Sequence, residues 1–144
     1  MINKCDVVII GAGAAGMMCA IEAGKRGRKV ILLDHAKKIG EKIRISGGGR
    51  CNFTNIYTDH KKFISSNPNF MISALSQYTH QNFIDLIQKY QISFHEKKLG
   101  QLFCDQIPQH SLDMLTVVCD KSNVLLLNNT VVESVDKSNH YIIK

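Results

Sequence analysis

The sequence predicts an α/β fold built around a parallel sheet. Two apolar segments, residues 5–10 (CDVVII) and 29–34 (KVILLD), are typical of strands buried on both faces. Between them, residues 14–26 combine strong helix formers with small and apolar positions, and Gly27 stands where a helix commonly ends. A strand, a helix and a second strand in this order form a right-handed βαβ unit, so we expect a doubly wound arrangement.

The middle of the sequence predicts a loop followed by two helices. Residues 40–55 are polar and dense in glycine, and we expect them to be irregular. A short helix is expected over residues 71–78, and Thr79 is suited to cap a second helix that continues to residue 90.

The last third of the chain continues the alternation. Residues 110–121 predict a helix, and VLLL at 124–127 predicts a third parallel strand. Two short strands, 130–135 and 141–143, are expected to form a small β-meander around a polar turn.

Composition places the chain among reduced, cytoplasmic proteins of one domain. The 144 residues contain five widely spaced cysteines, with no CxxC pair and no metal-ligand spacing, so we expect free thiols and no metal. No apolar run approaches the ~18 residues that a membrane span needs. The net charge of +6 favours anionic partners, but the lysine pairs are scattered, so we expect a solvated surface and regard nucleic acid as an unlikely partner.

A glycine fingerprint follows the first predicted strand. Gly11, Gly13 and Gly16 form GxGxxG, and Asp34 ends the next strand 21 residues after Gly13. Gly11 turns the chain, Gly13 lets a pyrophosphate approach, and Gly16 packs the helix on the strand. The amides of Ala14 and Ala15 would meet the diphosphate, and Asp34 would accept from a ribose, which favours FAD or NAD over NADP. A βαβ unit that binds nothing is the alternative, and the complete pattern disfavours it.

The segment GEKIRISGGGRCNFTN (40–55) narrows the choice of dinucleotide. Together with SSNPNF (65–70) and HEKKLGQLFCD (95–105), it closely resembles the BaiN-like, or YhiN-like, family of FAD-dependent oxidoreductases over essentially the whole chain. The resemblance implies a Rossmann-like fold, with Ser46 to Asn52 wrapping the flavin cofactor and Val132 passing the adenine. Asp34 departs from the glutamate that is common in the family.

The expected site is therefore a cofactor site without an assigned catalytic residue. Cys51 is assigned a contact and no chemistry, because no resolving cysteine lies at short spacing. Lys42 is a secondary candidate, since a loop lysine is more often solvated. The expected cofactor-binding residues are Gly11, Gly13, Ala14, Ala15, Gly16, Asp34, His35, Lys42, Ser46, Gly47, Gly48, Gly49, Arg50, Cys51, Asn52 and Val132.

The resemblance also sets expectations for the domain and its function. Members of the family are several hundred residues long, so residues 1–144 are expected to be the N-terminal part of an FAD-binding domain, without the inserted domain and the later FAD motif. An incomplete sheet would leave an uncovered surface and favour self-association. We expect the FAD-binding portion of an oxidoreductase that passes hydride from NAD(P)H through flavin to a small molecule. The alternatives are a catalytically incompetent dinucleotide-binding fragment and a basic flavoprotein that acts on tRNA.

Overall fold

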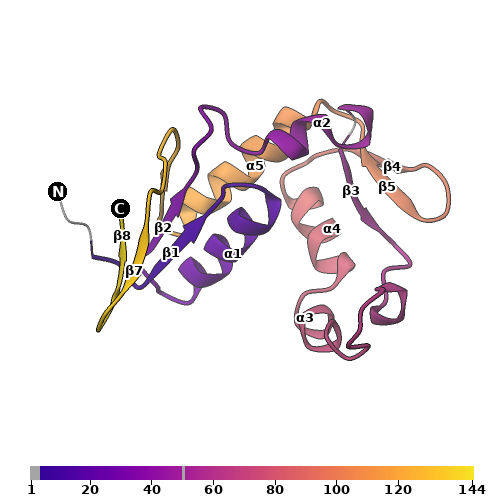
Figure 1. Cartoon of the computed structure of the whole chain (residues 1–144). Coiled ribbons are helices and arrows are strands. Elements are labelled where there is room, and N and C mark those ends of the chain that lie inside the picture. Colours follow the sequence, from indigo (N-terminus) through magenta and orange to yellow (C-terminus); the bar gives the residue numbers. More distant parts are fainter. Residues whose placement is uncertain (1–3, 50) are drawn as a thin grey trace. The chain divides into compact units, whose positions relative to one another are not determined.

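The computed structural model describes residues 4–49 and 51–144, which fall into two compact units. The first unit joins the two ends of the chain, Met1–Ile43 and Leu112–Lys144, and the second is the intervening Arg44–Ser111. Helix α2 (Glu41–Gly49) and helix α5 (Pro108–Lys121) each begin in one unit and continue into the other. Figure 1 shows the elements, with colours that follow the sequence.

A three-stranded parallel sheet forms the centre of the first unit. Its order is β1-β2-β6, with β1 at Val7–Ile10, β2 at Val30–Leu33 and β6 at Val124–Leu127. All four residues of β2 are buried, as expected of a central strand that carries apolar side chains on both faces. The predicted α/β fold and the third parallel strand are confirmed.

Helix α1 (Ala14–Lys25) completes the βαβ unit and packs on this sheet. Its buried residues, Met17, Ala20 and Ile21, recur at the spacing of one helical face. The helix ends in a Schellman motif, in which Gly27, at φ +75°, donates to Gly24 O and Arg28 donates to Ala23 O. The predicted helix and its glycine stop are confirmed.

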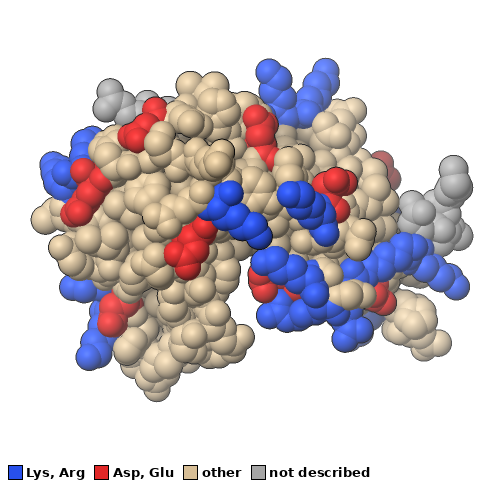
Figure 2. Space-filling model, turned by 180° about the vertical axis from the view of Figure 1, so that it is seen from behind, with Lys and Arg blue, Asp and Glu red and all other residues tan. Residues whose placement is uncertain are grey.

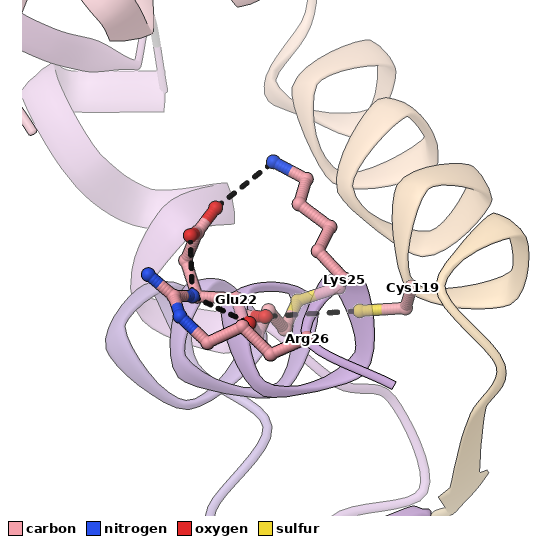
Figure 3. Close-up of polar contacts among 5 residues, drawn as sticks. Glu22, Lys25, Arg26 and Cys119 are labelled. Atoms are coloured by element: carbon pink, nitrogen blue, oxygen red, sulfur yellow. Dashed lines mark hydrogen bonds and ion pairs between the residues drawn. The ribbon is translucent and has the colours of Figure 1, made fainter. Parts of the chain in front are cut away.

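Helices α1 and α5 approach one another in the first unit. The Cys119 thiol of α5 lies 3.9 Å from the carbonyl oxygen of Met17, a contact drawn in Figure 3. On the outer surface of α1, Glu22 accepts from Lys25 at 2.9 Å and from Arg26 at 2.8 Å (Figure 3). Exposed pairs of this kind contribute only about 0–1 kcal/mol each, so burial on the sheet stabilises α1 more than these charges do.

One face of the sheet in the first unit carries exposed apolar side chains. The register places Val8 and Ile10 of β1 on the same face as Leu125 of β6, and these three are 36%, 57% and 46% exposed. Among the residues that the structure describes, β1 has a neighbouring strand on one side only. The expected uncovered surface is therefore present in this unit.

The C-terminal hairpin differs from the expectation. β7 (Val135–Lys137) and β8 (Tyr141–Ile143) pair antiparallel as two strands of a separate sheet. Residues 130–134 were predicted to begin the first of these strands, and that prediction is wrong. Thr130 is tied to Asp34 by a backbone hydrogen bond of 2.8 Å, and ladder pairing with β8 begins only at Val135.

The second unit has an antiparallel sheet and two helices of its own, in addition to parts of α2 and α5. The sheet order is β3-β5-β4, with β3 at Asn52–Asn55, β4 at Phe94–Glu96 and β5 at Gln101–Cys104. The unit's other elements are the 3-10 turn η1 (His60–Lys62), α3 (Ile72–Gln77) and α4 (His80–Lys89). Phe53 of β3 packs against Phe83 of α4, with ring centroids 5.9 Å apart. Thr79 caps α4 in a capping box with Asn82, as predicted.

The glycine-dense segment contains regular structure, which corrects the prediction of a loop over residues 40–55. Gly40, at φ +66°, precedes α2, and the segment continues into β3. Ile43 is buried, and the Arg44 guanidinium donates to the Gln109 side chain. Such tertiary anchors override the weak helix propensity of Gly47 to Gly49.

Candidate functional site

The glycine fingerprint forms a tight turn between β1 and α1. Gly11 adopts φ +105°, and its amide donates to the carbonyl of Leu33 at 2.7 Å, which ties the turn to β2. A Cβ added to Gly16 would lie 1.9 Å from the oxygen of Gly11, so only glycine lets α1 pack this closely on the turn. Two of the three glycines are thus required by the fold itself.

Gly13 has a different environment. A Cβ built on this residue meets no heavy atom within 4 Å, and its backbone has φ −83°. No neighbouring protein atom and no backbone conformation therefore requires glycine at position 13. The open space beside it fits the approach of a ligand phosphate to the backbone.

The first turn of α1 faces this space with backbone donors. Ala14 and Ala15 are exposed, Gly13 supplies no side-chain cap, and the turn contains no acidic residue. The amides of a first turn lack intrahelical acceptors and carry the positive end of the helix dipole. The arrangement suits an anionic group such as a diphosphate.

Asp34 follows β2 and its carboxylate is held beside the same turn. Oδ2 accepts from the amide of Ala12 at 2.6 Å, and Oδ1 accepts from the amide of Ala36 at 2.8 Å. The side chain is 12% exposed, so the carboxylate still reaches the surface. Each carboxylate oxygen has a second lone pair, which leaves capacity to accept from a ligand hydroxyl.

The other predicted residues of the first unit contribute less defined contacts. The His35 ring is 84% exposed, with Nδ1 3.6 Å from Oδ1 of Asp34. Lys42 is exposed in the first turn of α2. Val132 is half-buried and lies outside any strand, so the predicted adenine-lining strand is not formed there.

The SGGGRCN segment belongs to the second unit. Ser46 and Gly47 to Gly49 are in α2, and Asn52 begins β3 with an exposed side chain. Arg50 lies outside the described residues. The structure therefore brings the fingerprint and Asp34 together in one unit, and Ser46, Cys51 and Asn52 together in the other.

A buried thiol pair in the second unit was missed by sequence reasoning. Asn52 is opposite Phe103, and next to this pair the amide of Cys104 donates to the carbonyl of Cys51 at 3.2 Å. Both cysteines are buried, and the Cys104 thiol lies 3.3 Å from the hydroxyl of Ser111. The two cysteines are far apart in sequence, so only the pairing of their strands reveals the contact.

Hydrogen bonding shifts the pKa values of the two thiols in opposite directions. A hydrogen bond with Cys104, with smaller contributions from Ser111 and Ser46, lowers the pKa of Cys51 to about 6 against the opposing effect of burial. The same bond with Cys51, together with burial, raises the pKa of Cys104. The pair thus favours a thiolate at Cys51 and a neutral thiol at Cys104.

Basic side chains are distributed over the surface. In the view of Figure 2, Lys and Arg occur in several groups with Asp and Glu among them. One short exposed run, Lys25, Arg26, Arg28 and Lys29, follows the end of α1. Residues 4–49 and 51–144 include no cluster of His, Cys, Asp and Glu that could hold a metal, and none of their helices combines the length and apolarity of a membrane span.

Known proteins resemble this chain in sequence and in fold. It is 52% identical over 135 residues to the ribosomal RNA dihydrouridine synthase of Escherichia coli, covering 94% of this chain and 34% of that protein. For the enzyme of the same name from Haemophilus influenzae the identity is 46% over 130 residues, covering 90% and 32%. The chain therefore spans about a third of the length of these relatives.

The fold is shared more widely. L-proline dehydrogenase from P. horikoshii superposes with a TM-score of 0.63 at 15% sequence identity, covering 98% of this chain and 48% of that one. A likeness at this identity concerns the fold alone.

The family assignment rests on nearly the whole chain. Residues 5–144 match the family described as HI0933-like protein Rossmann domain. The resemblance inferred from SGGGRCN and its companion motifs is confirmed at this level, and the more specific BaiN-like assignment stays a prediction. The chain belongs to the HI0933-like family of FAD-binding Rossmann domains.

Proposed function

We propose that this chain supplies the FAD-binding part of a flavin-dependent enzyme that reduces uridine in ribosomal RNA to dihydrouridine. The observation that carries the proposal is the 52% identity, along 94% of this chain, to the ribosomal RNA dihydrouridine synthase of Escherichia coli. The proposal replaces the expected small-molecule substrate with RNA. It also revises the expectation that nucleic acid is an unlikely partner, and it is nearest in kind to the alternative of a flavoprotein that acts on tRNA.

In this proposal, the first unit holds the ADP half of FAD. The open space at Gly13 and the amides of Ala14 and Ala15 would receive the diphosphate, and the Asp34 carboxylate would accept from the adenosine ribose. His35, Lys42 and Val132 are secondary contacts in the same unit.

The SGGGRCN segment would hold the flavin side. Ser46 to Gly49, Cys51 and Asn52 would contact the cofactor, and Arg50 would add a charged donor. The chemistry that FAD supplies when bound is hydride transfer, for which we propose NAD(P)H as the electron source.

Charge supports an RNA substrate. The formal charge of +6 favours polyanions, and the exposed Lys25, Arg26, Arg28 and Lys29 can neutralise phosphates. Two of these four side chains also pair with Glu22, which moderates the local positive charge.

Ribosomal RNA from cells that lack the gene for this chain provides the test. We expect mass spectrometry of RNA digests to show a loss of dihydrouridine, which the unaltered gene restores and a gene with Gly13→Val does not. Gly16→Ala serves as a destabilised comparison, because its Cβ would clash with Gly11. Unchanged dihydrouridine in the absence of the gene would contradict the proposal.

The second candidate is a dinucleotide-binding part without activity of its own. The observation that favours it is the coverage of only about a third of the relatives. An assay of the purified chain with FAD, NADPH and ribosomal RNA distinguishes the two functions. Formation of dihydrouridine supports an active enzyme, whereas FAD binding without product supports a binding part.

A further inference from the structure

We propose that Cys51 and Cys104 form a peroxide-oxidisable dithiol, which closes as a disulfide between the start of β3 and the end of β5. The proposal concerns a modification site in the second unit and does not depend on the RNA substrate. It assigns Cys51 as the sulfur that is oxidised first and Cys104 as the sulfur that resolves the product.

The backbone already places the two residues at bridging distance. Cys51 immediately precedes β3, Cys104 ends β5, and the amide of Cys104 donates to the carbonyl of Cys51 at 3.2 Å. The adjacent pair, Asn52 and Phe103, is opposed across antiparallel strands, where Cα atoms are about 4.5–5.5 Å apart. Disulfides span Cα separations of about 4.4–6.8 Å, so the bridge needs no large movement of either strand.

Polar side chains surround the two thiols, although apolar side chains would be sufficient for packing alone. Ser111 is buried with its hydroxyl 3.3 Å from the Cys104 thiol, and Ser46 and Ser111 both interact with the Cys51 thiol. These hydroxyls can donate to a thiolate, which is the nucleophilic form of cysteine. The lowered pKa of Cys51 agrees with this arrangement.

The backbone of Cys51 is also unusual. Its φ is +46°, in the left-handed region, which residues with a Cβ adopt uncommonly. The amide of Cys51 donates to the carbonyl of Ser46, so the end of α2 holds the residue in this conformation.

The proposed oxidant is a hydroperoxide, and the reaction has two steps. The Cys51 thiolate attacks a peroxide oxygen, so an S–O bond forms, the O–O bond breaks, and hydroxide leaves as Cys51 becomes a sulfenic acid. The Cys104 sulfur then attacks the Cys51 sulfur. The S–S bond forms, the S–O bond breaks, and the thiol proton leaves with the hydroxide as water. Two thiols lose two electrons, and one peroxide gains them.

Intact mass, peptide mapping and thiol counting after hydrogen peroxide treatment test the proposal. In the unaltered chain the thiol count after denaturation should fall from five to three (5 − 2 = 3), and a peptide that joins Cys51 to Cys104 should appear. A dithiol reductant should restore five thiols. Because this measurement uses the unaltered chain, it does not depend on whether a variant folds.

Variants separate the two roles. Cys104→Ser should stop the reaction at a sulfenic acid on Cys51, which dimedone traps. Cys19→Ser, which removes an exposed cysteine elsewhere, should leave the bridge unchanged, with the count falling from four to two. Absence of the joined peptide, or oxidation confined to Cys5 and Cys19, would overturn the proposal.

Discussion

Gly13 is the residue whose role is not explained by the protein's own packing. The space around its missing Cβ is open and its φ is ordinary, whereas Gly11 and Gly16 are needed for the turn. We predict that Gly13→Val changes the free energy of unfolding by less than about 0.5 kcal/mol and weakens FAD binding about tenfold or more. Urea unfolding and flavin fluorescence titration measure the two effects. A variant that binds FAD as the parent does would remove Gly13 from the site.

Asp34 combines a structural and a binding role. Its carboxylate accepts from the amides of both Ala12 and Ala36, so an amide side chain can satisfy only one of them. We predict that Asp34→Asn lowers stability by about 1–3 kcal/mol, since one buried donor loses its acceptor, and weakens FAD binding by a similar amount. Asp34→Glu is the matched control, because it keeps the carboxylate and should bind FAD better than Asp34→Asn. Equal binding by the two variants would contradict the assignment.

Cys51 should respond to pH differently from an ordinary thiol. Cys104, Ser111 and Ser46 hold its pKa at about 6, so the thiolate is present above that pH and is lost as the pH falls through it. We predict an iodoacetamide labelling rate for Cys51 with a midpoint near pH 6, followed by mass spectrometry. Cys104→Ala removes the main hydrogen-bond partner and should raise the midpoint. A midpoint near the ordinary value of about 8.5 in the unaltered chain would contradict the prediction.

At the scale of elements, α1 depends on its close approach to the turn after β1. A methyl group at Gly16 would meet the oxygen of Gly11 at 1.9 Å, so either the helix or the turn must shift. We predict that Gly16→Ala destabilises the chain by about 1–3 kcal/mol, the usual range for overpacking. Urea unfolding of Gly16→Ala and of Gly13→Val compares their free energies of unfolding. Equal stability of the two variants would contradict the prediction.

The elements also show what the sequence can predict. The strands β1, β2 and β6 and the helix α1 follow from apolar patterns and glycine punctuation, both of which are local signals. Helix α2 was not predicted, because three consecutive glycines have weak helix propensity and the anchors at Ile43 and Arg44 are tertiary.

The candidate site, too, could be predicted from the sequence only in part. The fingerprint and Asp34 were predicted, because the glycine spacing after a strand and the acidic end of the next strand are both local signals. The strand at Val132 failed because pairing with β8 begins later, at Val135. The partnership of Cys51 with Cys104 depends on the register between β3 and β5, and no spacing rule contains that information.

At the scale of the whole molecule, the exposed apolar face of the first unit affects association. Ile10 of β1 is 57% exposed, and Val8 and Leu125 lie on the same face. Contiguous apolar surface and an unpaired strand edge favour self-association. We predict concentration-dependent oligomers in light scattering, which Ile10→Lys should reduce. Leu99→Lys, at a site 80% exposed in the second unit, is the control and should change little. A monomer at all concentrations would contradict this prediction.

We propose that this chain binds FAD through the turn at Gly13 and the carboxylate of Asp34. The most direct measurement is the visible absorption spectrum of the unaltered chain after incubation with FAD and gel filtration. We expect flavin absorbance to co-elute with the unaltered chain and to be lost with folded Gly13→Val. A colourless unaltered chain, or equal flavin retention by both proteins, would contradict it.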